Sequence, residues 1–228
     1  MTSSRVICKL MNFPKKVLAV FAHPDDESFG PGGILALWAE QGVEIHLLCA
    51  TYGEAGQGKK LGEIRSEELR VAGKILGIKK VEFLDFKDGR IGNQDLAKLE
   101  KIITDKVNRF RPDTILTFDL NGVSGHLDHI AVASATTQAF RKTMIAKRLY
   151  YFTIPKTFSD MVKDYFIYFP EGKRPEEADE KIDVSSVWKK RISAMDQHQS
   201  QKKDIEEIKK ELELGNKEEW FTVKLKSD

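Results

Sequence analysis

Two short segments of this chain concentrate side chains that can bind a metal ion. His23-Pro24-Asp25-Asp26-Glu27 lies near the start, and His126-Leu127-Asp128-His129 lies about midway along the chain. Three of the five histidines fall within these two segments. Imidazole and carboxylate groups together are the ligand set of hydrolytic metal sites, and zinc is the commonest metal with such ligands. The two segments therefore predict a mononuclear metal hydrolase.

The spacing within each segment suits ligands that share one ion. His23-x-x-Asp26 places two ligand-type groups on one turn, and His126-x-x-His129 places two imidazoles on the first turn of a helix. A catalytic zinc site needs three protein ligands, an open position, a base for the attacking water and a donor to the developing oxyanion. Any one of these side chains alone is more simply a capping or surface residue. Their joint occurrence favours the metal site.

The surrounding pattern indicates how these segments are positioned. Apolar, β-rich runs alternate with amphipathic helical patterns, and we expect strands near residues 15–22, 43–50, 81–86, 113–119 and 148–154. This alternation predicts an α/β fold with βαβ units and a mostly parallel central sheet. In such sheets ligands collect beyond the carboxyl ends of the strands. One motif segment follows the first strand, and the other follows the fourth.

Composition limits the class of protein. The chain has 228 residues and a net charge of +2, which argues against nucleic acid or an anionic membrane as partner. Two cysteines and the lack of a long apolar run predict free thiols, a cytoplasmic location and no membrane span. We expect an N-terminal extension over residues 1–14 and a single domain over residues 15–228, which ends in charged helices.

Five motifs together resemble one known family, the PIG-L/LmbE-like deacetylases. They are Ala22-His23-Pro24-Asp25-Asp26-Glu27, His126-x-Asp128-His129, Thr51-x-Gly53-Glu54-x-Gly56, Leu61-Gly62-x-x-Arg65-x-x-Glu68-Leu69 and His198-x-Ser200-Gln201. The resemblance implies a Rossmann-like three-layer sandwich. It also implies a zinc-dependent enzyme that removes the acetyl group from N-acetylglucosamine-type groups on small glycoconjugates.

The resemblance also implies a role for individual residues of the first two motifs. His23, Asp26 and His129 would bind one zinc ion per chain, with iron as the alternative metal. Asp25 would be the general base that activates water. The partner would be a small N-acetylated sugar conjugate, and relatives that self-assemble imply a homo-oligomer.

The remaining family positions would assist the reaction. His126 would stabilise the oxyanion or protonate the leaving amine, and Asp128 would orient it. Arg65 matches a position that holds the sugar, and His198 matches a C-terminal histidine of the family on the substrate side. We therefore expect Asp25, His126 and Asp128 to be catalytic and Arg65 and His198 to bind substrate.

Two other functions fit parts of the pattern. A metal-dependent hydrolase of another bond, such as a phosphoester, would more naturally use two metals and more bridging carboxylates. A metal-free nucleotide-binding protein would use the same type of sheet. The glycines of residues 30–33 match neither the dinucleotide nor the P-loop fingerprint, which counts against the nucleotide hypothesis.

Overall fold

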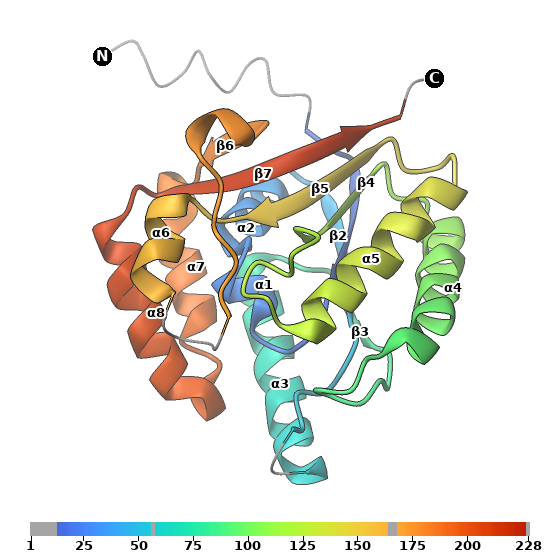
Figure 1. Cartoon of the computed structure of the whole chain (residues 1–228), viewed down its shortest axis with the longest axis horizontal. Coiled ribbons are helices and arrows are strands. Elements are labelled where there is room, and N and C mark those ends of the chain that lie inside the picture. Colours follow the sequence, from blue (N-terminus) through green and yellow to red (C-terminus); the bar gives the residue numbers. More distant parts are fainter. Residues whose placement is uncertain (1–12, 56–57, 164–167, 227–228) are drawn as a thin grey trace.

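The computed structural model describes residues 13–55, 58–163 and 168–226, and seven of its segments form one β-sheet (Figure 1). The strands are β1 Lys16–Phe21, β2 Glu44–Cys49, β3 Lys80–Phe83, β4 Thr114–Phe118, β5 Arg148–Thr153, β6 Glu180–Asp183 and β7 Glu218–Leu225. Their order is β3-β2-β1-β4-β5-β7-β6; β1 to β5 are parallel, and β7 is antiparallel to both neighbours. The predicted mostly parallel sheet is confirmed, and its first five strands have the Rossmann order.

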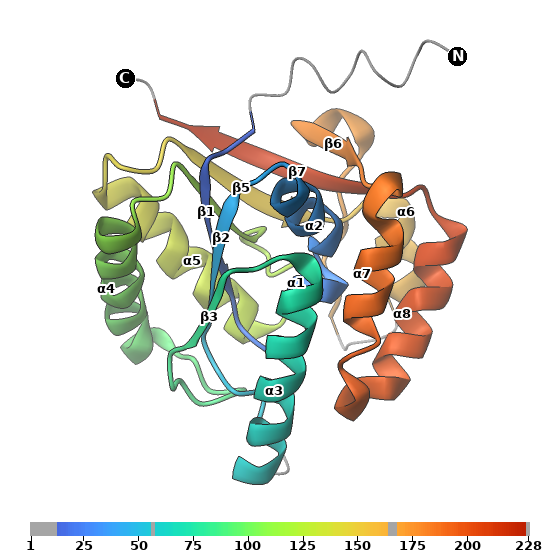
Figure 2. The same ribbon diagram turned by 180° about the vertical axis from the view of Figure 1, so that it is seen from behind.

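Helices cover both faces of the sheet, so the fold has three layers (Figures 1 and 2). The helices are α1 Asp26–Phe29, α2 Gly32–Glu40, α3 Lys59–Leu76, α4 Asn93–Phe110, α5 Leu127–Lys142, α6 Lys156–Val162, α7 Trp188–Met195 and α8 Lys202–Leu214. Helices α4 and α5 pack together on one face, while α2, α3 and α7 pack together on the other. Helix α4 shows how an amphipathic helix packs on the sheet, because it buries an apolar stripe of Leu99, Ile103 and Val107.

Strands β1 and β4 lie side by side in the middle of the sheet, with Val17 opposite Thr114. Both strands are buried along almost their whole length, which explains why neither alternates between apolar and charged residues. The chain leaves β1 toward β2 and leaves β4 toward β5. Because these connections diverge, they open a crevice at the carboxyl edge of the two strands. Both motif segments begin at this edge.

A buried ion pair ties the helices beside this crevice to β7. The carboxylate of Glu219 accepts hydrogen bonds from the backbone N–H groups of Gly33 and Ile34, at 2.6 and 2.7 Å. Arg191 of α7 lies 3.3 Å from that carboxylate and donates to the carbonyl of Phe29 at 2.8 Å. A Cβ on residue 33 would lie 2.7 Å from Glu219 Oε1, which explains the glycine there. We call Arg191 and Glu219 the buried anchor.

The end of the chain differs from the sequence-based expectation. Residues 171–181 are typical of a charged, solvated loop, yet the last two of them begin β6, and the chain ends in β7 rather than in the expected charged helices. The expected surface helix at residues 204–214 is α8. Cys49 is a buried free thiol, while Cys8 and most of the expected N-terminal extension lie outside the described residues. None of the described helices has the length and apolar character needed to span a membrane.

Candidate metal centre

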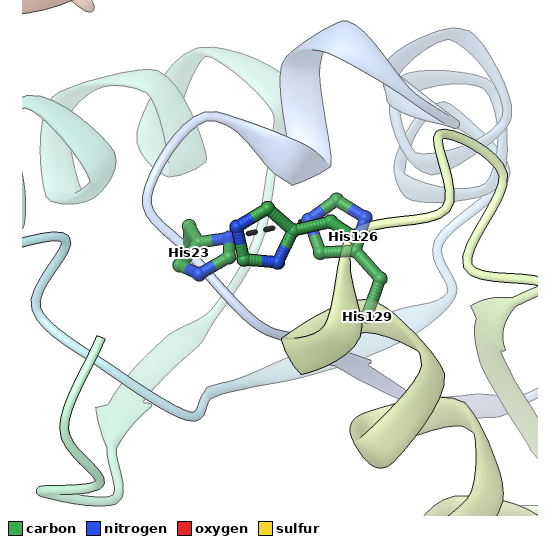
Figure 3. A group of neighbouring side chains, drawn as sticks. All are labelled: His23, His126 and His129. Carbon is green, nitrogen blue, oxygen red and sulfur yellow. Dashed lines mark hydrogen bonds between the residues drawn. The ribbon is translucent and has the colours of Figure 1, made fainter. Parts of the chain in front are cut away.

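The two motif segments meet at the carboxyl edge of β1 and β4. After β1 the chain turns through His23 into α1, and after β4 a loop leads to α5, of which His126 is the N-cap. Figure 3 shows the imidazole rings of His23, His126 and His129 gathered at this point. One nitrogen from each ring lies within 4.8 Å of the others. The fold thus brings both motifs to one site.

Three of the predicted ligands point their ligand atoms at one another. His23 Nδ1 lies 3.1 Å from His129 Nε2, and His129 Nε2 lies 3.3 Å from Asp26 Oδ1. His23 Nδ1 lies 3.9 Å from Asp26 Oδ2. The other side of the Asp26 carboxylate accepts hydrogen bonds from the backbone N–H groups of Ala22 and His23, so this ligand is held in place. We call His23, Asp26 and His129 the metal cluster.

Outer hydrogen bonds leave both imidazoles of the metal cluster with a lone pair facing inward. His129 Nδ1 lies 3.1 Å from the carbonyl oxygen of Gly122, which only accepts, so this nitrogen carries the proton. His23 Nε2 lies 2.9 Å from Asp88 Oδ1 and 3.1 Å from Asp128 Oδ2 and donates to these carboxylates. The two inward nitrogens, 3.1 Å apart, then need a shared cation between them. Carboxylates and carbonyls behind the imidazoles are the usual outer partners of metal-ligating histidines.

The charges around the metal cluster agree with this requirement. Burial works to lower the pKa of His23, but its hydrogen bonds to Asp128 and Asp88 outweigh burial and raise that pKa to about 10. Burial works to raise the pKa of Asp26, but the charge and hydrogen bond of His129 hold it far below its usual range. The site therefore keeps an ionised carboxylate and attracts a positive charge, whether a proton or a metal ion.

Asp25, the predicted base, lies beside the metal cluster in a strained backbone conformation. Its φ angle is 114°, a region that residues other than glycine rarely adopt and that is often found at functional sites. Burial raises the pKa of Asp25 to about 6, although the nearby Arg65 acts to lower it. Such a carboxyl has the pKa of an effective general base near neutral pH.

Arg65 is predicted to hold the sugar, and the structure places it against the Asp25 loop. Its guanidinium donates to Asp25 Oδ2 at 2.9 Å, to the carbonyl of Pro24 at 2.7 Å and to the carbonyl of Gly53 at 3.0 Å. A Cβ on residue 53 would lie 2.6 Å from the guanidinium, so only glycine permits this approach. Arg65 also lines the cavity beside the metal cluster, but most of its N–H groups already donate hydrogen bonds within the protein.

His126 and Asp128 are together as predicted, but their contact differs from the expected one. His126 Nδ1 accepts a hydrogen bond from the backbone N–H of Asp128 at 3.2 Å. The carboxylate of Asp128 instead accepts from His23 and from the backbone N–H groups of Gly89 and Ile91. Because Nδ1 of His126 accepts, its Nε2 carries the proton. A nitrogen of His126 is also near enough to His23 and His129 to be an alternative third ligand.

His198 is predicted on the substrate side, and the structure buries it completely. Its Nε2 lies 2.8 Å from Glu27 Oε1, and Glu27 Oε2 accepts a hydrogen bond from the backbone N–H of Asp25 at 3.1 Å. Burial works to lower the pKa of His198, while the Glu27 carboxylate raises it, with a net upward shift. His198 therefore contacts the base loop through Glu27 and presents no surface to a ligand.

Sequence reasoning missed Asp88, Glu27 as a partner of His198, and the buried anchor. Asp88 follows β3 at the same edge of the sheet as the motifs, and its carboxylate contacts His23. An acidic residue just beyond a third parallel strand was the available signal for it. The buried anchor carried no such signal, because its two members lie far from both motifs in the chain.

The metal cluster forms one end of a cavity of about 850 Å³. His23, Asp25, Asp26, His126 and His129 line that end. A volume of this size is typical of sites for small organic molecules. The arrangement therefore supplies a cation site, a base and an N–H donor at one end of a ligand-sized cavity.

The N-terminus of α2 is not available to a phosphate group. In dinucleotide-binding proteins the helix N-terminus beside the first strand binds the pyrophosphate. Here the first free N–H groups of α2, from Gly33 and Ile34, donate to Glu219. An internal carboxylate thus takes the position that a nucleotide phosphate would need, which counts against the nucleotide-binding hypothesis.

The fold and this cluster define a Rossmann-like α/β protein with a candidate metal centre at the point where the strand order reverses. The sequence family described as PIG-L, GlcNAc-PI de-N-acetylase, matches residues 18–140, more than half of the chain. The chain belongs to the PIG-L family of deacetylases, as its motifs predict.

Individual relatives cover almost the whole chain. A probable N-acetyl-alpha-D-glucosaminyl L-malate deacetylase 2 of Bacillus anthracis is 28% identical over 92% of this chain and 93% of its own length. The structure of the N,N'-diacetylchitobiose deacetylase from Pyrococcus horikoshii is similar at a TM-score of 0.65 and 20% identity, over 93% of this chain and 84% of that one. GalB, the 4-carboxy-2-hydroxymuconate hydratase from Pseudomonas putida, reaches a TM-score of 0.69 at 23% identity, over 94% and 98%. At these identities the two structures show the fold alone.

Proposed function

We propose that this protein is a metal-dependent N-deacetylase that hydrolyses the acetamido group of an N-acetylglucosamine-type conjugate and releases acetate and the free amine. The observation that carries the proposal is the metal cluster: two inward imidazole nitrogens 3.1 Å apart that share a carboxylate, beside a strained, partly buried aspartate. The deacetylase activities for which the relatives are named support the same substrate class. We also propose that the protein is cytoplasmic and forms a homo-oligomer.

The residues present fit a single divalent metal. His23 Nδ1, Asp26 and His129 Nε2 would hold it, and mixed imidazole and carboxylate donors suit zinc, with iron as the alternative. When bound, the metal would polarise the acetyl carbonyl and make water more acidic. Asp88, Asp128 and the Gly122 carbonyl would keep the two imidazoles in the required tautomers.

In this proposal Asp25 transfers the proton, and His126 stabilises the negative charge that develops on the acetyl oxygen. The Asp25 carboxylate takes a proton from the attacking water as the water oxygen bonds to the acetyl carbon. His126 donates a hydrogen bond from Nε2 to the acetyl oxygen, which gains negative charge during the attack. The C–N bond then breaks, and the proton held on Asp25 passes to the leaving nitrogen.

The remaining predicted residues act mainly by positioning the general base and the metal ligands. We propose that Arg65 positions Asp25 and leaves only a small part of its surface for the sugar. Asp128 orients His23 rather than His126. His198 is a positioning residue that acts through Glu27 on the backbone of Asp25, in place of the substrate contact suggested by its motif.

Acetate release and metal content test the proposal together. Protein stripped with a chelator and reloaded with zinc or with iron is assayed on N-acetylglucosamine and its methyl glycoside, and bound metal is measured. We expect about one metal per chain and acetate release that depends on it. His129→Ala should bind well below one metal per chain. Asp25→Asn should keep the metal and lose turnover by about 10²–10⁴-fold, because an amide cannot accept the proton.

Asp105→Asn is the matched control, because this aspartate lies on the surface of α4, where it forms an ion pair with Lys101 far from the motif segments. It should behave like the parent. If the metal-loaded protein releases no acetate from any N-acetylated sugar, the proposed function is wrong. If Asp25→Asn turns over at the parental rate, the base is another residue.

A further inference from the structure

The cavity continues well beyond the metal cluster, into an arm between α6 and α8. These two helices lie next to each other in both views of the molecule (Figures 1 and 2). The arm is lined by Phe158 and Met161 of α6, Ile208 and Leu212 of α8, and Trp220 of β7. If an acetamido group lies at the metal cluster, the rest of a conjugate extends toward this arm. Its apolar lining would favour burial of apolar surface there.

The charges of the arm disfavour an acidic ligand. Four acidic residues line this part of the cavity, namely Asp204, Glu207, Glu211 and Glu218. Among the described residues that line the whole cavity, the basic ones are Arg65, Arg191 and Lys210. Arg65 is bonded to Asp25 and Arg191 to Glu219, so among the described lining residues Lys210 is the basic residue that remains beside Glu207, Glu211 and Glu218.

We propose that the group attached to the amino sugar is apolar and carries no negative charge, such as an alkyl or aromatic aglycone. This inference rests on the proposed deacetylase function and deepens it. A carboxylated aglycone such as L-malate would enter an acidic arm without the paired guanidinium groups that recognise carboxylates. An alkyl chain would bury its methylenes against the α6 and α8 side chains.

A matched set of substrates tests this proposal. The methyl, n-octyl and L-malyl α-glycosides of N-acetylglucosamine share the acetamido group and differ only in the aglycone. Acetate release is measured with the metal-loaded protein, with the octyl compound kept below its micelle-forming concentration. We expect kcat/KM for the octyl compound to exceed that for the methyl compound by at least about tenfold, since each buried methylene contributes about fourfold. The malyl compound should be the poorest of the three.

The outcomes separate the two proposals. If none of the three compounds releases acetate, the deacetylase function itself fails. If the malyl compound matches or exceeds the octyl compound, the deacetylase function stands and the apolar aglycone is wrong. Equal kcat/KM for the methyl and octyl compounds also overturns the apolar aglycone, because the arm then contributes nothing.

Charge reversal on α8 provides a second readout. The double variant Glu207→Lys/Glu211→Lys should raise kcat/KM for the malyl compound relative to the methyl compound by about tenfold or more. The matched control is Glu206→Lys/Glu213→Lys, which changes the same charge on the same helix, on the side that faces Asp196 and Gln199 of the segment after α7. The control should leave all three values unchanged. An equal effect of both doubles on the malyl compound would overturn a specific role of the arm.

The apolar side of the arm has its own variant. Leu212→Asp should lower the ratio of kcat/KM for octyl over methyl by several-fold, because a carboxylate replaces apolar contact area. The melting temperature reports whether the variant folds. A folded Leu212→Asp protein with the parental octyl preference would contradict the proposal.

Discussion

The metal cluster and the buried anchor both place charged groups in the protein interior, yet their partners differ. In the buried anchor, Arg191 and Glu219 have opposite charges, and their remaining polar atoms bond to backbone groups of α1 and α2. In the metal cluster, two imidazole nitrogens face each other at 3.1 Å beside a carboxylate. The buried anchor is complete without any ligand, whereas the metal cluster is complete only with a cation.

The difference separates stability from function. Removal of one member of the buried anchor leaves a buried charge without its partner, which costs stability. Removal of His129 from the metal cluster leaves Asp26 with its hydrogen bonds from the backbone N–H groups of Ala22 and His23, so the main cost is to metal binding. The two regions therefore predict opposite results from substitutions of similar size.

The largest effect is expected at the buried anchor. Arg191→Met should lower the free energy of unfolding by about 3–5 kcal/mol, because Glu219 loses its partner in a buried position. Chemical denaturation of the metal-free protein measures this change. In the same assay His129→Ala should lose far less stability. If His129→Ala is destabilised as strongly as Arg191→Met, the contrast between the two regions is wrong.

Two further variants sharpen the anchor prediction. Lys190→Met is the matched control, because Lys190 is adjacent in sequence but pairs with Glu40 on the surface, where both side chains are 40% exposed or more. It should change stability by less than about 1 kcal/mol. The double variant Arg191→Met/Glu219→Gln should lose less than the sum of its single changes, because the two residues interact directly.

An effect of intermediate size, on metal affinity, is expected at Asp88, whose carboxylate contacts His23. Asp88→Asn weakens one of the two carboxylate contacts of His23 and should lower zinc affinity by about 10–100-fold. Competition with a chelator of known affinity measures the change, and denaturation should show a much smaller effect than for Arg191→Met. An unchanged zinc affinity would exclude Asp88 from the support of the site.

The smallest effect is expected for the ion pair between helices α4 and α5. Its effect on the free energy of unfolding is a reference for the two larger effects. Lys142 of α5 donates to Glu100 of α4 at 2.6 Å and holds the pKa of Glu100 below its usual range. Lys142→Gln should cost less than about 1 kcal/mol at pH 7. A lowered carboxyl pKa stabilises the fold above the unfolded value of about 4.3, so the difference should shrink as the pH falls below 4.3. A difference that persists at pH 2.5 would show that the pair is not its cause.

The sequence predicted the position of the site better than its internal contacts. The alternation of strands and helices determines which strand ends share an edge, so His23 and His129 could be placed together although they lie 106 residues apart. Which carboxylate meets which imidazole depends on side-chain direction. Asp128 was assigned to its neighbour His126, but its position in the first turn of α5 directs its carboxylate to His23.

The late strands were missed for a different reason. In β7, only Glu219, Trp220 and Phe221 are fully buried, and the strand lacks the long apolar run of β1. Because β7 adds at the antiparallel end of the sheet, the βαβ pattern that predicted the other strands does not extend to it. The burial of Glu219 depends on a contact 186 residues away, with the N-terminus of α2. Local sequence patterns carry no information on such a contact.

The position of Glu219 in the chain has a consequence for the order of events during synthesis. A ribosome releases α2 and its neighbouring motif early, but the carboxylate that binds the N-terminus of α2 emerges about 180 residues later. Until then the N–H groups of Gly33 and Ile34 lack their carboxylate partner, and Arg191 can bond to the carbonyls of α1 but lacks its ion pair. The nascent chain therefore cannot complete the contacts at the N-terminus of α2, close behind its first motif, before the residues of β7 have been made.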